Sequence, residues 1–268
     1  MKKLRFILII SMLIALFACK NNDFSDLEKK IAKLNSKVDS LESKLNDTMP
    51  VVINLDSPLV KFDFNQDSID LSGNGYDFKM HNGAKMVKPP DHSFWDYAVQ
   101  FDGVDDYLEL SKPLPDSRKI TISYWQYSDD NSIIYGTIFC DATVDWGNDF
   151  FTVSSYNRIG IRADKGIGSY LNFEEDSPES LKGLKLYQEW NFVSFVIDGE
   201  NLIVYLNGNK IYDEKIVGSN EGFHADHPII GARNVYGKND MFFKGMIDNF
   251  SIYDRALNQE EVRKLMKG

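Results

Sequence analysis

Trp146 lies in a short polar stretch that also carries Asn148 and Asp149. An indole ring between polar residues can act as a stacking platform for a pyranose ring. Further along the chain, the guanidinium of Arg233 suits direct hydrogen bonding to a sugar or to a carboxylate, with Asn234 beside it. These five residues form the candidate ligand-binding set. Alternatively, the Trp146 side chain anchors its own loop, because a large aromatic side chain buries much apolar surface wherever it packs.

Paired carboxylates would indicate a glycosidase, because a retaining enzyme needs two carboxyl groups about 5–5.5 Å apart. The acidic residues Glu174, Asp176 and Glu179 lie close enough in the sequence to match the spacing of glycosidase carboxylates. However, Pro178 and the neighbouring charges argue against a central strand, since proline cannot donate a hydrogen bond to the ladder. We interpret this stretch as a solvated acidic loop and predict no catalytic residues. A glycoside hydrolase is the minor alternative.

His224 and His227 are transition-metal ligand types, but they precede Pro228 and have no third ligand nearby in the sequence. A turn with exposed histidines is the better interpretation. Cys140 follows Ile138 and Phe139 in an apolar run, which predicts a buried and unreactive thiol.

Cys19 is preceded by a positively charged start and an apolar stretch at 6–17. The run Leu16-Phe17-Ala18-Cys19 resembles the bacterial lipobox. The apolar stretch is too short to span a hydrocarbon core of about 30 Å, so a cleaved signal is favoured over a membrane helix. The resemblance implies lipidation of Cys19 and anchoring in the cell envelope, at the outer membrane or cell surface. The alternative is a plain secretory peptide that contains a cysteine.

The formal net charge is −10, which argues against nucleic acid and against anionic lipid surfaces as partners, since both require clusters of Lys and Arg. The chain has 2 cysteines, so lipidation of Cys19 would leave Cys140 without an intrachain disulfide partner. The fold must then be held together by its hydrophobic core.

Residues 24–48 show a heptad pattern. Apolar residues alternate at spacings of four and three: Leu27, Ile31, Leu34, Val38, Leu41 and Leu45. β-Branched residues at a with Leu at d favour a parallel dimer. We expect self-association through this coiled-coil stalk, as a dimer or trimer. The alternative is a single amphipathic helix that packs on its own domain.

The chain from residue 59 onward predicts an all-β domain. Asn207-Gly208 supplies the positive φ values that a type I′ hairpin requires. Strands are predicted at 98–101, 107–110, 120–127, 136–140, 150–154, 158–162, 190–197, 202–206, 210–212, 229–231 and 242–253. A helix is predicted at 259–266, with Asn258 and Glu261 as a capping box. Many antiparallel strands and 13% aromatic residues predict a two-sheet sandwich.

Several motifs resemble a bacterial laminin-G-like, concanavalin A-like domain. In order, they are Asp70-Leu71-Ser72-Gly73-Asn74-Gly75, Phe101-Asp102-Gly103-Val104-Asp105-Asp106-Tyr107-Leu108, Thr121-Ile122-Ser123-Tyr124-Trp125, Trp190-Asn191-Phe192-Val193 and the segment from Phe243 to Leu257. The resemblance covers roughly residues 59–266 and implies a jelly-roll sandwich of two curved antiparallel sheets. That architecture hosts lectins, adhesion modules and glycosidases, so it does not settle function.

The resemblance also implies a structural calcium ion that joins the first loop to the last strand. Asp70, Asn74 and Asp248 are the matching ligands; the alternative is that Asp and Asn stabilise their own turns. Asn148 and Asp149 are similar in position to calcium-binding residues of pentraxins. The cation at Arg233 argues against a pentraxin-like calcium site there.

These features predict four segments: a lipoprotein signal peptide at 1–18, a lipidated stalk at 19–48, a linker at 49–58 and a laminin-G-like sandwich at 59–268. The favoured function is a membrane-anchored, non-catalytic module that binds a glycan or glycoprotein. The alternative is a structural or protein-adhesion module that does not bind sugar.

Overall fold

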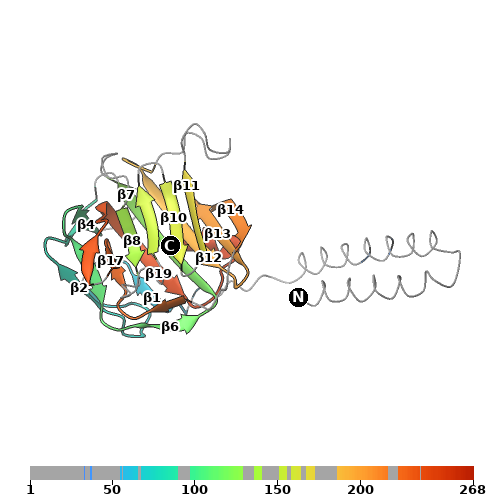
Figure 1. Ribbon diagram of the computed structural model, residues 1–268, viewed down its shortest axis with the longest axis horizontal. Coiled ribbons are helices and arrows are strands. Elements are labelled where there is room, and N and C mark those ends of the chain that lie inside the picture. The colour runs from blue at the N-terminus through green and yellow to red at the C-terminus, as the bar shows by residue number, and fades with distance from the viewer. Residues whose placement is uncertain are drawn as a thin grey trace, which may run out of the picture. The chain divides into compact units, whose positions relative to one another are not determined.

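Two antiparallel β-sheets make up the unit Asn54–Gly268 in the computed structural model (Figure 1). The structure describes Leu55, residues 57–65, 68–89, 97–128, 136–140, 151–155, 158–163, 167–172, 186–216, 223–235 and 237–268, and also Lys33 and Lys37. Only the backbone is described in the strands between 151 and 172. Lys33 and Lys37 are both helical, and the rest of the predicted stalk lies outside the described residues. Among the described helices, none is long and apolar enough to cross a membrane.

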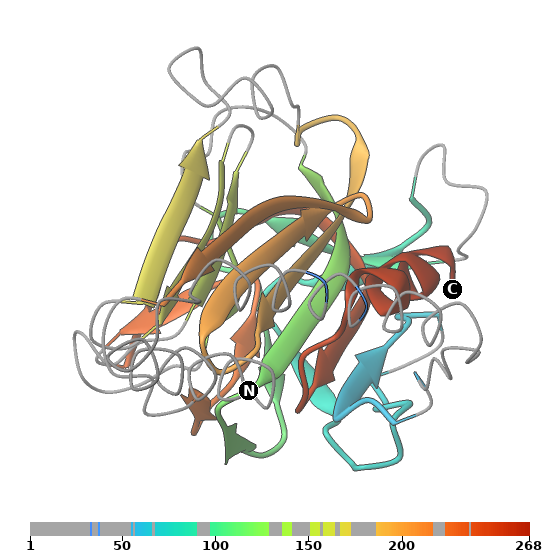
Figure 2. The same cartoon turned by 90° about the vertical axis from the view of Figure 1, so that its right-hand side faces the viewer.

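The first sheet, sheet A, follows the order β14-β13-β12-β7-β19-β4-β3, and β1 also pairs with β19 (Figure 2). Its strands are β1 (Val60–Phe62), β3 (Lys85–Val87), β4 (Ala98–Asp102), β7 (Ile120–Ser128), β12 (Trp190–Ile197), β13 (Asn201–Leu206), β14 (Asn209–Lys215) and β19 (Lys244–Tyr253). The strands predicted at 120–127, 190–197 and 242–253 are confirmed as β7, β12 and β19, and β19 begins at Lys244.

The second sheet, sheet B, follows the order β11-β10-β9-β8-β16-β5-β2. Its strands are β2 (Phe78–His81), β5 (Tyr107–Leu110), β8 (Gly136–Cys140), β9 (Phe151–Ser155), β10 (Arg158–Ala163), β11 (Ile167–Asn172) and β16 (Ile229–Ile230). Two small ribbons pair β6 (Leu114–Ser117) with β15 (Phe223–Ala225) and β17 (Arg233–Val235) with β18 (Lys238–Asp240). The all-β prediction of a two-sheet antiparallel sandwich is therefore confirmed.

The turn between β13 and β14 has the geometry that its sequence predicts. Asn207 has φ 50° and Gly208 has φ 73°, the left-handed values of a type I′ turn. The Asn207 side chain also fixes the neighbouring strand, because its Oδ1 accepts a hydrogen bond from the Phe192 amide at 2.9 Å and its Nδ2 donates to Asn191 Oδ1 at 3.0 Å. One residue thus sets both the turn and its attachment to β12.

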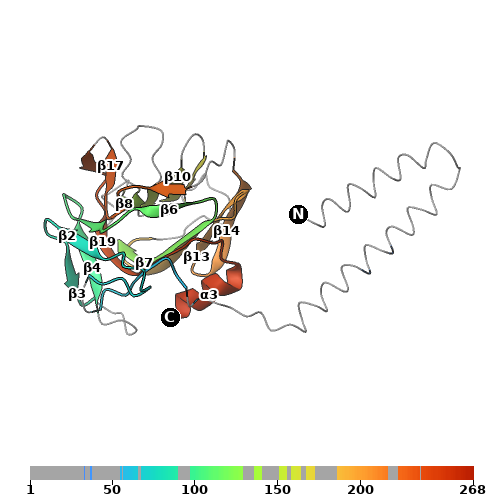
Figure 3. The ribbon, with the colours of Figure 1, turned by 90° about the horizontal axis from the view of Figure 1, so that it is seen from below.

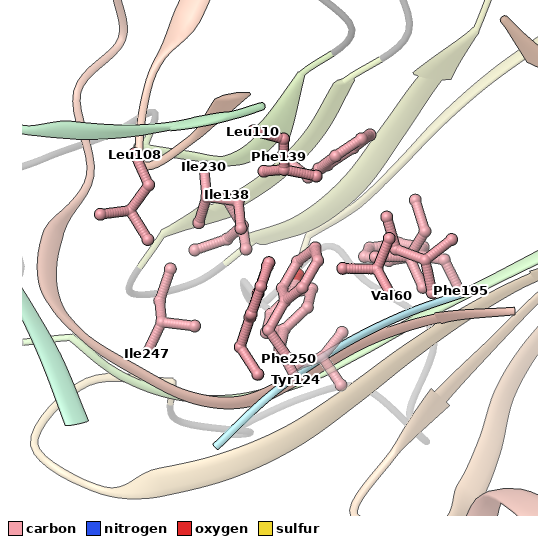
Figure 4. Packing of buried hydrophobic residues seen from close by; sticks show 14 of the residues in the cluster. Val60, Leu108, Leu110, Tyr124, Ile138, Phe139, Phe195, Ile230, Ile247 and Phe250 are labelled. Atoms are coloured by element: carbon pink, nitrogen blue, oxygen red, sulfur yellow. The ribbon is translucent and has the colours of Figure 1, made fainter. Parts of the chain in front are cut away.

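Apolar side chains from both sheets meet between the layers and form the main core (Figure 4). Phe250 of β19 lies at the centre, with its ring centroid 6.3 Å from Tyr124 of β7 and 5.9 Å from Phe139 of β8. Period-two alternation produces this layer, because every second side chain of a strand points to the same face. Burial of these large side chains supplies the main driving force for folding.

A second apolar layer covers the outer face of sheet A. Phe192, Tyr253 and Val262 are buried there, and Val262 belongs to α3 (Gln259–Lys267). Figure 3 shows α3 on the side of sheet A that faces away from sheet B. The predicted capping box is confirmed: Asn258 accepts from the Glu261 amide, and the Glu261 side chain accepts from the Asn258 amide. Leu55 also packs on this layer.

Gln126 of β7 is fully buried and lies opposite Ile247 of β19. Neither polar atom of its side chain has a hydrogen-bond partner within the described structure. A buried unsatisfied polar group costs about 1–3 kcal/mol, so we expect Gln126→Met to raise the free energy of unfolding by about 1 kcal/mol. Urea unfolding measures this change. Thr121→Val is the matched control and should destabilise the fold, because the Thr121 hydroxyl donates to Arg255 O and accepts from the Leu257 amide. A less stable Gln126→Met protein would contradict the interpretation.

Candidate functional site

Arg233 and Asn234 lie on β17, the first strand of the β17–β18 hairpin. Arg233 pairs with Asp240 across the hairpin, through Nε to Oδ1 at 2.8 Å and Nη2 to Oδ2 at 2.6 Å. The side chain of Asp240 is 51% exposed, whereas that of Arg233 is 11% exposed. Asn234 is bound within the same hairpin, since it contacts the Asn239 side chain and accepts from the Gly237 amide at 3.2 Å. Sequence reasoning missed Asp240, which offers the more accessible polar group.

The hairpin folds over the outer face of sheet B. Cys140 Sγ, at the end of β8, lies 4.0 Å from the Asn234 carbonyl oxygen. Figure 3 places β17 beyond β8, on the side away from α3. Cys140 is buried, as predicted. Asn234 therefore lies next to the strand end from which the chain continues toward Trp146. Trp146, Asn148 and Asp149 themselves lie outside the described residues, so their role as ligand contacts stays a prediction.

Asp70 and Asn74 stabilise the turn that follows β1. Asp70 Oδ1 accepts from the Lys61 and Ser72 amides, and Oδ2 accepts from the Ser72 hydroxyl at 2.6 Å and the Tyr76 amide at 2.9 Å. Burial alone would raise the pKa of Asp70, but these hydrogen bonds outweigh it and hold the pKa below its ordinary value. Asn74 Nδ2 donates to the carbonyl oxygens of Pro58 and Leu59. Both side chains thus tie the turn to the start of β1.

Asp248 lies on β19 at a break in the strand register, where Asn249 has φ 45°. The bulge leaves the Asp248 carboxyl group 0% exposed. Its Oδ1 accepts from the Asn249 amide at 2.6 Å, and its Oδ2 has no hydrogen-bond partner in the part of the chain that the structure describes. Burial raises the pKa of Asp248 to about 8, and the negative charge of Asp63 contributes to the shift.

The Asp248 environment fits a cation better than the Asp70 turn does. A buried carboxylate oxygen without a donor, with a second carboxylate near it, is the arrangement that a bound cation would neutralise. Asp63 follows β1, and β1 pairs with β19 next to the bulge. Sequence reasoning missed Asp63, because only the pairing of the first and last strands brings it to Asp248. The predicted calcium set of Asp70, Asn74 and Asp248 stays a prediction.

Asp102, Asp105 and Asp106 lie close together in the turn between β4 and β5. Two of these carboxylates accept hydrogen bonds from backbone amides: Asp102 Oδ1 accepts from the Val104 amide, and Asp106 accepts from the Gly83 and Asp102 amides. These carboxylates close the turn and join it to the loop before β3.

The other candidates from the sequence are the two histidines near β15 and the acidic stretch that contains Glu174. His224 belongs to β15, and His227 is exposed beyond the end of that strand, in agreement with the predicted exposed turn for His227. Glu174, Asp176 and Glu179 lie outside the described residues.

The comparison with protein families matches residues 102–263 to Laminin_G_3 of the concanavalin A-like lectin/glucanases superfamily. The chain belongs to this family. Its sandwich, with two antiparallel sheets and the described helix α3 at the C-terminus, is the concanavalin A-like jelly roll that the sequence motifs imply. Among curated proteins, the chain is 29% identical over 124 residues to botulinum neurotoxin type X of Clostridium botulinum. That match covers 44% of this chain and 9% of the toxin.

Two solved structures with a similar fold contain a bound saccharide. Domain 4 of the extracellular GH43 arabinanase AbnA from Geobacillus stearothermophilus, solved in complex with arabinotriose, has a TM-score of 0.58 at 18% identity and covers 78% of this chain and 98% of its own. The ligand-binding domain of botulinum neurotoxin serotype D, in complex with N-acetylneuraminic acid, has a TM-score of 0.59 at 15% identity. This chain spans about half of that structure, 51%, and 80% of this chain is matched. At these sequence identities, the structural similarity establishes the fold alone.

Proposed function

We propose that the unit Asn54–Gly268 is a non-catalytic carbohydrate-binding module. The observation that carries this proposal is the match to the arabinanase domain, because it covers 98% of a domain that was solved with an oligosaccharide. The toxin domain solved with a sialic acid supports the same class of ligand. The β17–β18 hairpin supplies polar groups on the outer face of sheet B, and the Trp146 segment is proposed to add the stacking ring.

The tether is proposed from the sequence. Signal cleavage before Cys19, lipidation of Cys19, a self-associating stalk at 19–48 and a linker at 49–58 would hold the module at the cell envelope. Dimerisation or trimerisation would strengthen weak single-site binding, because the second contact becomes intramolecular. The outer membrane or cell surface is the proposed location.

We also propose a structural calcium ion at Asp248. The unpartnered Oδ2 of this buried carboxyl group and the nearby charge of Asp63 support the proposal. Asp70 and Asn74 remain candidate ligands from the sequence. Calcium accepts six to eight oxygen ligands, so backbone carbonyl oxygens would complete the shell.

A glycan array tests the binding proposal. We expect the chain without its signal peptide to bind saccharides, and Trp146→Ala to weaken binding by about tenfold or more if the ring stacks on the sugar. Trp125→Phe is the matched control, because Trp125 packs on the outer layer of sheet A, 5.4 Å from the Phe192 ring. Residues 54–268 alone should bind more weakly to a dense glycan surface than the chain with its stalk. Capture of one protein partner without saccharide competition would instead favour the protein-adhesion alternative.

A further inference from the structure

The outer face of sheet B carries a second group of side chains, near its β2 edge. His81 of β2 and Tyr107 of β5 are directly paired across the strands, and Glu109 lies two residues from Tyr107 on the same face. The intervening Leu108 points into the main core, which confirms that Tyr107 and Glu109 face outward. We refer to His81, Tyr107 and Glu109 as the β2–β5 cluster.

The three side chains of the cluster hold one another in place. The His81 and Tyr107 rings are stacked, with centroids 4.3 Å apart and an interplanar angle of 3°. His81 Nε2 lies 2.8 Å from Glu109 Oε2. The His81 side chain is 19% exposed and the Glu109 side chain 46% exposed. The cluster is therefore oriented before a ligand arrives, which lowers the entropy cost of binding.

Each member of the cluster keeps an unused hydrogen-bonding group. Within the described part of the chain, Glu109 Oε1, the Tyr107 hydroxyl and His81 Nδ1 make no hydrogen bond. A carboxylate oxygen accepts hydroxyl protons, a phenol both donates and accepts, and an imidazole nitrogen does either according to its tautomer. The hydroxyl groups of one sugar ring can both donate to and accept from these three groups.

The cluster also continues toward the β17–β18 hairpin. Tyr107 packs against a small apolar group formed by Cys140, Ile229 and Ala232. Ala232 directly precedes Arg233, so the cluster and the hairpin are joined by a contact on one face of the sheet. An oligosaccharide can extend from one to the other.

We propose that the β2–β5 cluster is a saccharide subsite that selects neutral or amino sugars over acidic ones. The selectivity comes from Glu109, because its carboxylate repels the carboxylate of a uronic or sialic acid in a chain whose net charge is already −10. This inference rests on the proposed carbohydrate-binding function and adds to it the place of a subsite and the charge class of the ligand.

The test measures saccharide affinity of the chain without its signal peptide, on the glycan array and then by calorimetry with the best neutral oligosaccharide. Glu109→Ala should weaken binding by about tenfold or more. Tyr107→Phe, which keeps the stacked ring and removes only the hydroxyl, should weaken it by about threefold to tenfold with an unchanged Tm. Lys215→Gln is the matched control, because exposed Lys215 lies on β14 at the edge of sheet A and not on sheet B, and it should bind as the unaltered chain does.

The possible results separate this inference from the function it rests on. If the unaltered chain binds saccharides and both cluster variants bind equally well, the subsite is overturned and the binding function stands. Preference for sialylated or uronic glycans would overturn the proposed selectivity. If the unaltered chain binds no saccharide at all, the proposed function fails, and the subsite fails with it.

Discussion

In the presence of a chelator, Asp248→Asn should raise the free energy of unfolding at about pH 7.5 by about 2 kcal/mol or more. The substitution removes a buried carboxyl group that, at this pH, must either carry its charge out of contact with water or stay protonated far above the pKa of an exposed carboxyl group. The pKa of Asp248 is about 8 in the folded protein and 3.8 in an unperturbed carboxyl group. Between these values the unfolded chain binds fewer protons than the folded one. Stability of the metal-free protein should therefore fall as pH rises through this window, by up to about 1.4 kcal/mol per pH unit.

Urea unfolding at a series of pH values in chelator measures this effect. The Asp248→Asn protein should show a flatter pH dependence, and the two proteins should converge near the acid end of the window. Asp105→Asn removes an equal charge from an exposed position and is the control for the change in net charge. Equal slopes for Asp248→Asn and the unaltered protein would show that the carboxyl group does not titrate in this range.

With calcium in place of the chelator, the unaltered protein should become more stable than Asp248→Asn. A ligand that binds only the folded state at about 100 to 1,000 times its Kd stabilises by about 2.7–4.1 kcal/mol. We expect this gain for the unaltered protein and its loss in Asp248→Asn, measured as the change in Tm on adding calcium. An equal rise of Tm in both proteins would exclude Asp248 as a ligand.

The second large effect is expected at Asp70. In the unaltered protein, the Tyr76 amide and the Ser72 hydroxyl donate to Asp70 Oδ2. Asp70→Asn keeps the shape of the side chain but places an NH2 group against these two donors. Loss of these charge-assisted hydrogen bonds should lower the free energy of unfolding by about 2–4 kcal/mol. Because hydrogen bonding holds the folded pKa of Asp70 below its ordinary value, this stabilisation is present above the ordinary carboxyl pKa. It is lost as pH falls through the lower folded pKa.

Denaturant unfolding at neutral and acidic pH measures the Asp70 effect. Asp77→Asn is the matched control in the same turn, because Asp77 Oδ1 accepts one hydrogen bond, from the Asp70 amide at 2.9 Å. It should cost about 1 kcal/mol. If the two variants are equally stable, the four hydrogen bonds to Asp70 do not hold the turn as the structure indicates.

The longer strands could be predicted because their signals are local. The period-two pattern of β7 and the Asn207-Gly208 turn depend on neighbouring residues alone. The short strands β1, β2 and β3 were missed, since three or four residues are too few to show a period. Their conformation is set by partners elsewhere in the chain: Val60 pairs with Ile252, and Phe78 pairs with Leu110.

The candidate site was less predictable for the same reason. Arg233 reads as a free cation in the sequence, but the β17–β18 turn brings Asp240 opposite it. Asp248 reads as a strand residue, and its lack of a donor at Oδ2 follows from the bulge at Asn249. His81 and Glu109 lie on different strands, so only the register of β2 against β5 brings them together. Residue types were readable from the sequence, whereas the partners of each residue were not.

The entry of the chain into the sandwich has a mechanical consequence. The Tyr253 hydroxyl donates to the Leu55 carbonyl oxygen at 3.3 Å, and the Asn74 side chain holds the next carbonyl groups along the chain, at Pro58 and Leu59. A protein pulled between a surface and a captured particle would carry tension through Leu55 first. These hydrogen bonds and the pairing of β1 with β19 would then break first. They would set the force at which unfolding begins, because forced unfolding is governed by the unfolding rate. The force that such a tether withstands would then depend on these contacts at the entry of the chain into the sandwich.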